Sequence, residues 1–380
     1  MMRSMRGAAA LALAGALVAG CENDGFVDVG DPPAPPRALN AFYYAGAVHV
    51  TWELSPQWDG DSFRVYAKRV SDADYFLIAD VTNCSGGLCS YTDSNVTPGV
   101  TYVYYVAAVS PRSGLETASD DAVEVAVPQA VPPPVPGQVE VVALDNANFL
   151  RWDQAARQDS DFSHYRVWLV SGGDSFLLGE TDSEGFLDLL AQNGFTYTYF
   201  VTSVDDQGHE SQGSASAVGT PRPDFQREWV WDYFDRPDAS GFRFQESEET
   251  NPILSGDSSQ RHFRLETDTD GWWLVPGPNT NIHPDGFITT ALKCGVAADA
   301  GCVDLKQAPT SGYVTQDIGL FPQTTYVLRV RGDDGQNHYA AIRVELLGFD
   351  ENDAAIMIFD WAYQLQPGNP ELASRSVPAR

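Results

Sequence analysis

Two stretches of this 380-residue chain follow one pattern, and this tandem repeat limits the fold more than any other feature. The parallel segments are TWELSPQWDGDSFRVY (51–66) with RWDQAARQDSDFSHYRVW (151–168), and TYVYYVAAV (101–109) with TYTYFVTSV (196–204). Trp52 and Trp152 lie 100 positions apart, whereas Tyr102 and Tyr197 lie 95 apart, so the copies differ in loop length. The chain therefore contains two copies of one kind of domain.

Proline clusters mark the ends of these copies. They are DPPAPPR (31–37), VPPPVPG (131–137) and TPRPD (220–224). Proline interrupts both helices and strands, so such clusters are typical of connections between domains. They predict two repeated domains at 38–129 and 135–222 and a third domain at 224–370.

Apolar and polar residues alternate in short segments of each copy. In AVHVTWEL (47–54) the residues at 48, 50, 52 and 54 are apolar, and Phe63, Val65 and Ala67 continue the pattern in the next segment. A period of two is that of a strand with one buried face. Several short strands separated by glycine and proline turns, without a long helical period, predict a β-sandwich.

Each copy resembles a fibronectin type III domain. The residues that carry the resemblance are a proline before the first strand, the core residues Trp52 and Trp152, the strands FRVY and YRVW, and TPGVTYVYYVAAV (97–109). Tyr102 and Tyr197 match the tyrosine corner of that family. The second copy has LAQNGFTY (190–197), without the usual proline before the glycine, which leaves that turn in doubt. The resemblance covers 35–222 and implies immunoglobulin-like sandwiches that space or display other domains, with aromatic residues in the core.

The last segment also consists of strand-like stretches. They are FRFQE (242–246), RHFRLE (261–266), GWWLV (271–275), GFITTAL (286–292), GYVTQDI (312–318), TTYVLRVR (324–331), YAAIRVELL (339–347) and AAIMIFDWAYQ (354–364). Met357, Phe359, Trp361 and Tyr363 share one face of the last stretch, which we expect to face the core. The pattern predicts an all-β domain, either a sandwich or a jelly roll.

The amino terminus has the pattern of an export signal. Arg3 and Arg6 precede an apolar run, and LVAGC (17–21) resembles the lipobox of bacterial lipoproteins. The resemblance implies cleavage after residue 20 and a lipid on Cys21, with 21–37 as a tether. It also implies anchoring to a membrane, with the outer membrane or cell surface favoured because Glu22 is not the aspartate of inner-membrane retention. The alternative is an ordinary signal peptide with an incidental cysteine.

The other four cysteines form two close pairs, Cys84 with Cys89 and Cys294 with Cys302. Their spacing matches no zinc motif, so we predict no metal site. In an exported chain local disulfides are favoured, although four cysteines allow three pairings.

Charge excludes one class of partner. The chain carries a formal charge of −29, and removal of the two arginines of the signal would make it −31. Such a surface repels nucleic acid and anionic lipid headgroups, so we expect neither as a partner. A hydrophobic content of 43% is ample for packed cores.

The end of the third domain resembles the HmuY-like haem-binding lipoproteins. The resemblance rests on TYVLRVRGDDGQNHYAAIRVEL (325–346) and FDWAYQ (359–364). It implies haem as a ligand, and His283 and His338 are candidate ligand-binding residues. Neither they nor His262 can be placed as axial ligands, so haem capture is an alternative and no cofactor is predicted.

Trp272 and Trp273 are adjacent, and neighbouring residues on a strand point to opposite faces. One ring therefore leaves the core unless both faces are covered. An outward tryptophan can stack on a sugar or contact a protein partner. Both are candidate ligand-binding residues, with coverage by a loop as the alternative.

No catalytic residues are predicted. Gly-Asp-Ser occurs at 173–175 and 256–258, but without a matching Asp-x-x-His near the end of the chain. The sequence therefore favours a surface-displayed protein that binds a glycan, protein or matrix partner. Capture of haem or another small ligand is the alternative, and a hydrolase is the weaker one.

Overall fold

The computed structural model describes residues 31–247, 250–295 and 298–372. The predicted signal peptide, Cys21 and residues 21–30 of the predicted tether lie outside the described residues. The described chain is all-β, as predicted, with two short 3₁₀ turns at Ala156–Gln158 and Pro237–Ala239. It divides into two compact units, one ending at residue 127 and the other starting at 128, with residues 43–46 grouped with the second. Among the described residues no helix is long and apolar enough to cross a bilayer.

The first repeat forms a sandwich of two antiparallel sheets. One sheet contains β1 (Arg37–Tyr44), β2 (Ala47–Glu53) and β5 (Leu88–Asp93). The other contains β4 (Phe76–Val81), β3 (Ser62–Arg69), β6 (Thr101–Val109), β7 (Glu116–Ala118) and β8 (Val123–Ala126), the last also pairing with β6. Val48, Val50 and Trp52 have no exposed surface, which confirms the alternation predicted for β2. This is the two-sheet sandwich that the sequence predicted for the first repeat.

The second repeat has the same arrangement. Its sheets are β9 (Glu140–Leu144), β10 (Ala147–Arg151) and β13 (Gly185–Asp188) on one side and β12 (Asp174–Thr181), β11 (Phe162–Ser171), β14 (Tyr197–Asp205) and β15 (Ala217–Gly219) on the other. The ring of Trp152 packs edge-on against Tyr165, with ring centres 5.2 Å apart. Trp152 is therefore a core residue, as its counterpart Trp52 is.

Both tyrosine corners are confirmed. The Tyr102 hydroxyl accepts a hydrogen bond from the Thr97 N–H, and the Tyr197 hydroxyl accepts one from the Gln192 N–H, both at 3.0 Å. Gly194 has a φ of 81°, a conformation that only glycine adopts without a steric cost. The turn of the second copy therefore keeps its geometry without the missing proline.

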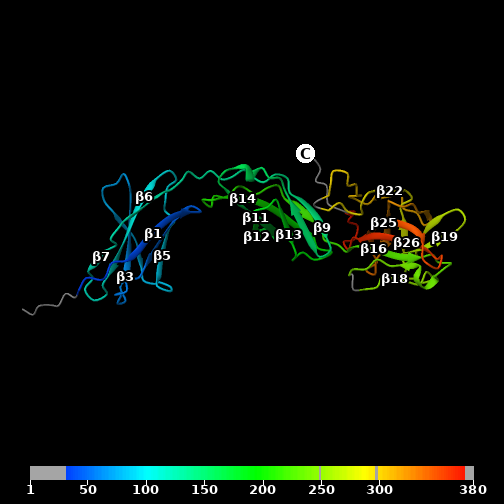
Figure 1. Ribbon diagram of the computed structural model, residues 1–380, viewed down its shortest axis with the longest axis horizontal. Coiled ribbons are helices and arrows are strands. Elements are labelled where there is room, and N and C mark those ends of the chain that lie inside the picture. The colour runs from blue at the N-terminus through cyan, green and yellow to red at the C-terminus, as the bar shows by residue number, and fades with distance from the viewer. Residues whose placement is uncertain (1–30, 248–249, 296–297, 373–380) are drawn as a thin grey trace, which may run out of the picture. The chain divides into compact units, whose positions relative to one another are not determined.

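The third domain is also a sandwich. Its large sheet has the order β16 (Asp224–Trp231), β26 (Ala355–Tyr363), β25 (Asn337–Phe349), β24 (Thr324–Arg331) and β21 (Thr280–Ile282), with β22 (Phe287–Ile288) also on β24. Its small sheet has the order β18 (Ile253–Leu254), β17 (Gly241–Phe242), β19 (Phe263–Thr267), β20 (Trp272–Pro276) and β23 (Ile318–Gly319). Figure 1 shows β16 and β26 side by side, although they come from the two ends of this domain's sequence. Met357, Phe359, Trp361 and Tyr363 lie in the core between the sheets, as predicted.

Two strands expected in this domain are mostly irregular. Of 286–292 and 312–318, only Phe287–Ile288 and one end residue, Ile318, belong to strands. Described residues of this part of the chain instead cover the outer face of the large sheet, where Leu292 and Tyr313 pack in a cluster with Tyr339. These apolar residues are buried by packing on the outer face of the large sheet and not by forming strands. The expectation of two full strands was therefore wrong.

The structure pairs Cys84 with Cys89 and Cys294 with Cys302, which is the local pairing that the spacing favoured. The second disulfide closes a short loop within the cover of the large sheet. The first lies at the start of β5.

The second repeat and the third domain belong to one compact unit. Arg222, between the two prolines at 221 and 223, is fully buried, and its guanidinium lies 3.5 Å from the Glu371 carboxylate. The Lys293 ammonium contacts the Asp224 carboxylate and donates to the Ala143 carbonyl at 3.0 Å. The proline cluster at 220–224 thus marks a change of sheet without separating two independent bodies.

Candidate functional site

A cavity of about 530 Å³ lies at one end of the third domain, at the turn between β24 and β25. We call it the end cavity. Its walls come from the chain after β17, the residue before β19, the β24–β25 turn, the first residues of β25 and the end of β26. Its volume falls within the range of small-molecule sites, about 300–1,000 Å³.

Four rings form the floor of the end cavity. Phe244 and Tyr363 are stacked with ring centres 5.6 Å apart, and the His262 ring lies 5.5 Å from that of Phe244. The His338 ring is 5.6 Å from that of Tyr363. Strand alternation directs two of these rings between the sheets. His338 lies on the same strand face as the buried Ala340, and Tyr363 lies on the same face as the buried Trp361.

His262 is held as a neutral ring in one tautomer. Its Nδ1 accepts a hydrogen bond from the Phe244 N–H at 3.0 Å. Burial, together with the nearby positive charge of Arg243, lowers the pKa of His262 to about 3. A neutral imidazole whose Nδ1 accepts must carry its proton on Nε2. His262 therefore presents an N–H donor at Nε2.

His338 has the opposite arrangement. Its Nδ1 lies 3.0 Å from the Gln364 carbonyl, which can only accept, so Nδ1 carries a proton and donates. Its Nε2 lies 3.2 Å from each carboxylate oxygen of Asp334. The Gln336 N–H lowers the pKa of Asp334, and His338 contributes less. Asp334 is thus an ionised acceptor at the cavity.

The Tyr363 side chain brings a hydroxyl to the same cavity. Burial raises the pKa of Tyr363, and the charges of Asp334 and Glu246 raise it further, so the phenol is neutral. Arg243 lines the wall and is paired with Asp333 at 2.6 Å. Donors and acceptors therefore both converge above the aromatic floor.

The two tryptophans take opposite faces of the small sheet, as predicted. Trp272 packs against the core, and its ring lies 5.7 Å from that of Phe349. Trp273 occupies the other face, where its indole N–H donates to Asp268 at 2.9 Å. Both are half-buried. Trp273 is therefore the outward-facing ring of the pair, and neither tryptophan lines the end cavity.

The structure does not bring His283 and His338 together. His283 contacts Tyr313 in the cover on the outer face of the large sheet, whereas His338 belongs to the end cavity between the sheets. Within the cavity, Nε2 of His338 faces Asp334, and Nε2 of His262 carries a proton. These residues do not fit a haem site with two histidine ligands. Among the described residues no cluster of three or more metal-ligating side chains occurs.

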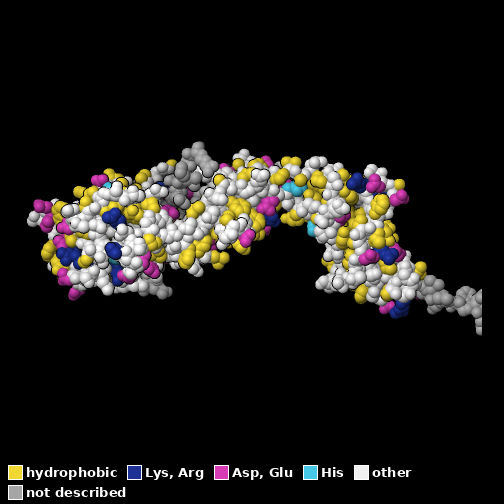
Figure 2. Space-filling model, turned by 180° about the vertical axis from the view of Figure 1, so that it is seen from behind, with side chains coloured by type: hydrophobic (Ala, Val, Ile, Leu, Met, Phe, Trp, Pro, Cys, Tyr) yellow, Lys and Arg dark blue, Asp and Glu magenta, His cyan; other side chains and the backbone are white. Residues whose placement is uncertain are grey.

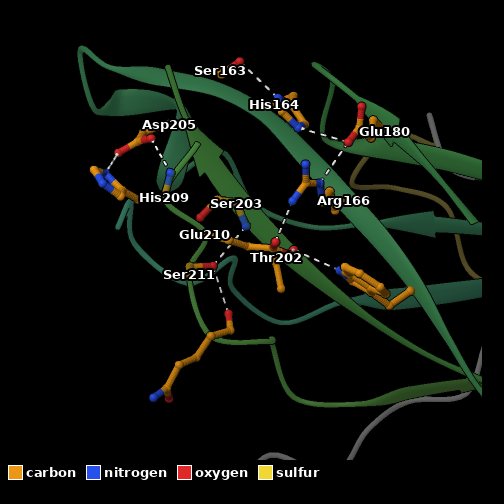
Figure 3. Close-up of polar contacts among 12 residues, drawn as sticks. Ser163, His164, Arg166, Glu180, Thr202, Ser203, Asp205, His209, Glu210 and Ser211 are labelled. Atoms are coloured by element: carbon orange, nitrogen blue, oxygen red, sulfur yellow. Dashed lines mark hydrogen bonds and ion pairs between the residues drawn. The ribbon is translucent and has the colours of Figure 1, made fainter. Parts of the chain in front are cut away.

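A second polar network lies on the second repeat, across β11, β12 and β14 (Figure 3). Arg166 bridges Glu180 at 2.9 Å and Glu210 at 2.7 Å, and the Thr202 hydroxyl donates to Glu210 at 2.5 Å. The network satisfies charged groups of three neighbouring segments of one sandwich. Its geometry is that of a structural ion-pair network.

Near this network, Asp205 and His209 form a hydrogen bond of 2.8 Å, which raises the question of a catalytic triad. The nearby serine hydroxyls donate to backbone carbonyls instead, Ser203 to Pro134 and Ser211 to Gln212. A nucleophile must be within hydrogen-bonding reach of its base. In the part of the chain that the structure describes, this pair has no such serine.

The end cavity was only partly foreseen. The sequence pointed to His338, but it drew no role for Phe244 or His262, which lie on segments far apart in the chain. The alternation of β26 predicts that Tyr363 is a core residue. It does not predict that Tyr363 lies at the open end of the strand. Only the alternation of β26, counted to its last residue, gave a signal for Tyr363.

Comparison with known proteins gives partial likenesses. No family model matches the chain. An amylopullulanase of Thermoanaerobacterium thermosulfurigenes is 26% identical over 164 residues, which cover 42% of this chain and 8% of that protein. The chicken CNTN1 FN1–FN3 domains are 16% identical, cover 50% of this chain and 68% of theirs, and have a TM-score of 0.37. An Fn3-like protein from Clostridium thermocellum is 25% identical, covering 24% of this chain and 97% of its own, with a TM-score of 0.21. The chain therefore spans only a small part of the curated relative.

Proposed function

We propose that this chain is a lipid-anchored bacterial surface protein. In this proposal Cys21 carries the lipid, the two fibronectin type III sandwiches act as spacers, and the third domain binds the ligand. The end cavity is the observation that carries the proposal. It gathers donors and acceptors above an aromatic floor, whereas Trp52, Trp152 and the tyrosine corners of the two repeats serve their cores and turns.

The partner class that we favour is a glycan, with a protein or matrix surface as the broader alternative. Sugars combine apolar ring faces with many hydroxyl groups, and the end cavity offers rings together with carboxylates and an arginine. The acidic surface disfavours anionic partners. Figure 2 shows Asp and Glu side chains scattered over the visible face of the molecule, in keeping with 52 acidic against 23 basic residues.

The anchor makes a prediction about location. Replacing Cys21 with serine should move the protein from the membrane fraction to the soluble fraction of the exporting cell, because serine has no thiol to receive the lipid. Fractionation followed by mass spectrometry of the mature amino terminus measures this. A Cys84→Ser/Cys89→Ser variant is the control, since it changes thiols without touching the anchor and should stay in the membrane fraction. An unmodified wild-type chain found free in the medium would contradict the proposal.

Binding is tested with the full mature chain on an array of neutral and acidic oligosaccharides, with extracellular matrix proteins in parallel. We expect retention of neutral glycans and weak retention of acidic ones. Hydrolysis of ester or glycoside probes, or a Soret band with haemin that disappears in His338→Ala, would contradict the binding proposal. The first result would favour the hydrolase alternative, and the second would favour small-ligand capture.

A further inference from the structure

We propose that the end cavity binds the terminal sugar unit of an uncharged glycan, with the Tyr363 hydroxyl and the Nε2–H of His262 contacting it directly. The inference rests on the proposed function, because it names which part of the glycan binds and which residues contact it. It goes further by assigning Tyr363 and His262 as direct contacts and by excluding the outward tryptophan of the small sheet as the main contact.

Two unpartnered polar groups point to a ligand. The residues Tyr363 and His262 are only 6% and 7% exposed, and both line the end cavity. Within the described part of the chain, neither the Tyr363 hydroxyl nor His262 Nε2 has a hydrogen-bond partner, whereas Nδ1 of the same histidine is engaged. Neither atom is among the fully buried polar atoms that lack a hydrogen-bond partner, so both face the open space of the end cavity and are available to a bound molecule.

The polarity of the wall specifies what that molecule carries. His262 can only donate at Nε2, while Asp334 and Glu246 can only accept when ionised. A ligand that contacts both the donor and the acceptors must carry groups that can accept and donate hydrogen bonds at once. This is the property of a hydroxyl group. Several hydroxyls placed around one small ring satisfy such a wall, and this is the chemistry of a sugar.

The charges of the wall favour an uncharged ligand. Three carboxylates, those of Glu246, Asp333 and Asp334, surround the cavity, and Arg243 is paired with one of them at 2.6 Å. An anion would face these three carboxylates, two of which already contact Arg243 and His338, and close like charges repel. A cation would face the guanidinium of Arg243 and the donor of His262. A neutral polyhydroxylated unit avoids both repulsions.

The buried floor limits how the ligand enters. Phe244 is 3% exposed and closes the bottom of the cavity together with the Tyr363 ring. A continuous chain cannot pass through this floor, so a chain end enters from the open side. We therefore expect recognition of a terminal unit and not of internal units of a polymer.

The test uses the mature full-length protein and isothermal titration with methyl glycosides of neutral hexoses, after selection on the array. Tyr363→Phe removes one oxygen and keeps the ring stack with Phe244, so folding is unchanged. We expect its affinity to fall at least fivefold, because a buried group of the sugar loses its partner. His262→Asn can keep the acceptor for the Phe244 N–H and lacks the Nε2 donor, and it should weaken binding in the same way.

Two control variants separate the inference from the proposed function. Tyr233→Phe removes a hydroxyl that donates to Asp257 elsewhere in the domain, and its affinity should stay within about twofold of the wild type. Glycan binding that is lost in Trp273→Ala but retained in Tyr363→Phe would overturn the cavity assignment and leave the proposed function standing. A wild-type chain that binds no glycan on the array would overturn the glycan function together with the inference.

Discussion

Replacing Arg222 with methionine should lower the free energy of unfolding of the unit that begins at residue 128 by about 3–5 kcal/mol. Arg222 is fully buried and faces Glu371, which is only 4% exposed. Removal of the guanidinium takes away the positive charge that faces this buried carboxylate. The cost of a buried, uncompensated charge exceeds that of any lost surface ion pair.

Calorimetry of the mature chain measures this effect through the unfolding transition of that unit. Arg157→Met is the matched control, because the Arg157 side chain is 44% exposed beside Glu184 and its loss should cost less than about 1 kcal/mol. The double variant Arg222→Met/Glu371→Leu removes both charges and should recover most of the lost stability. Equal destabilisation by the buried and the exposed arginine would show that the pair does not hold the two sandwiches together.

Lowering the pH from 6 to 4 should cost the same unit about 2.5 kcal/mol through His262 alone, at about 1.4 kcal/mol per unit of pKa difference. The pKa of His262 is about 3 in the folded protein against 6.5 for an unperturbed histidine, because burial disfavours the charged ring. Between these two values the unfolded chain binds the proton and the folded chain does not. Stability is therefore greatest above pH 6.5 and falls steadily as the pH drops toward 3.

Denaturant titrations at several pH values test this prediction. Other groups also titrate in acid, so the informative quantity is the difference between the wild type and His262→Asn. The asparagine does not ionise, and the slope of its stability between pH 6 and 4 should be smaller by the predicted amount. Parallel slopes for the two proteins would mean that His262 is protonated in the folded state or is not buried.

The regular strands of the two repeats were predictable because their burial follows local alternation. Val48, Val50 and Trp52 alternate in sequence and are all fully buried in the structure. The tyrosine corners were equally predictable, since each hydrogen bond joins residues only five positions apart. Local rules of this kind need no knowledge of the partner sheet.

Buried polar pairing in the same repeats was not predictable. The Tyr104 hydroxyl donates to Asp93 at 3.0 Å, and the Tyr199 hydroxyl donates to Asp188 at 2.8 Å, in equivalent positions of the two sandwiches. No local sequence pattern links either tyrosine to its aspartate. Each pair joins two different sheets, so it exists only once the sandwich has closed.

The sequence by itself determined that this is an all-β chain with two repeated sandwiches and a third β-domain, because a period of two and turn residues act over a few neighbouring positions. Only the tertiary structure decided that Leu292, Leu305 and Tyr313 cover a sheet, that Trp272 faces inward while Trp273 faces outward, and that His262 contacts Tyr363. Which face of a strand is buried, and which strand ends share a cavity, depends on how two sheets stack. That stacking is set by contacts between residues more than a hundred positions apart, which no local pattern records.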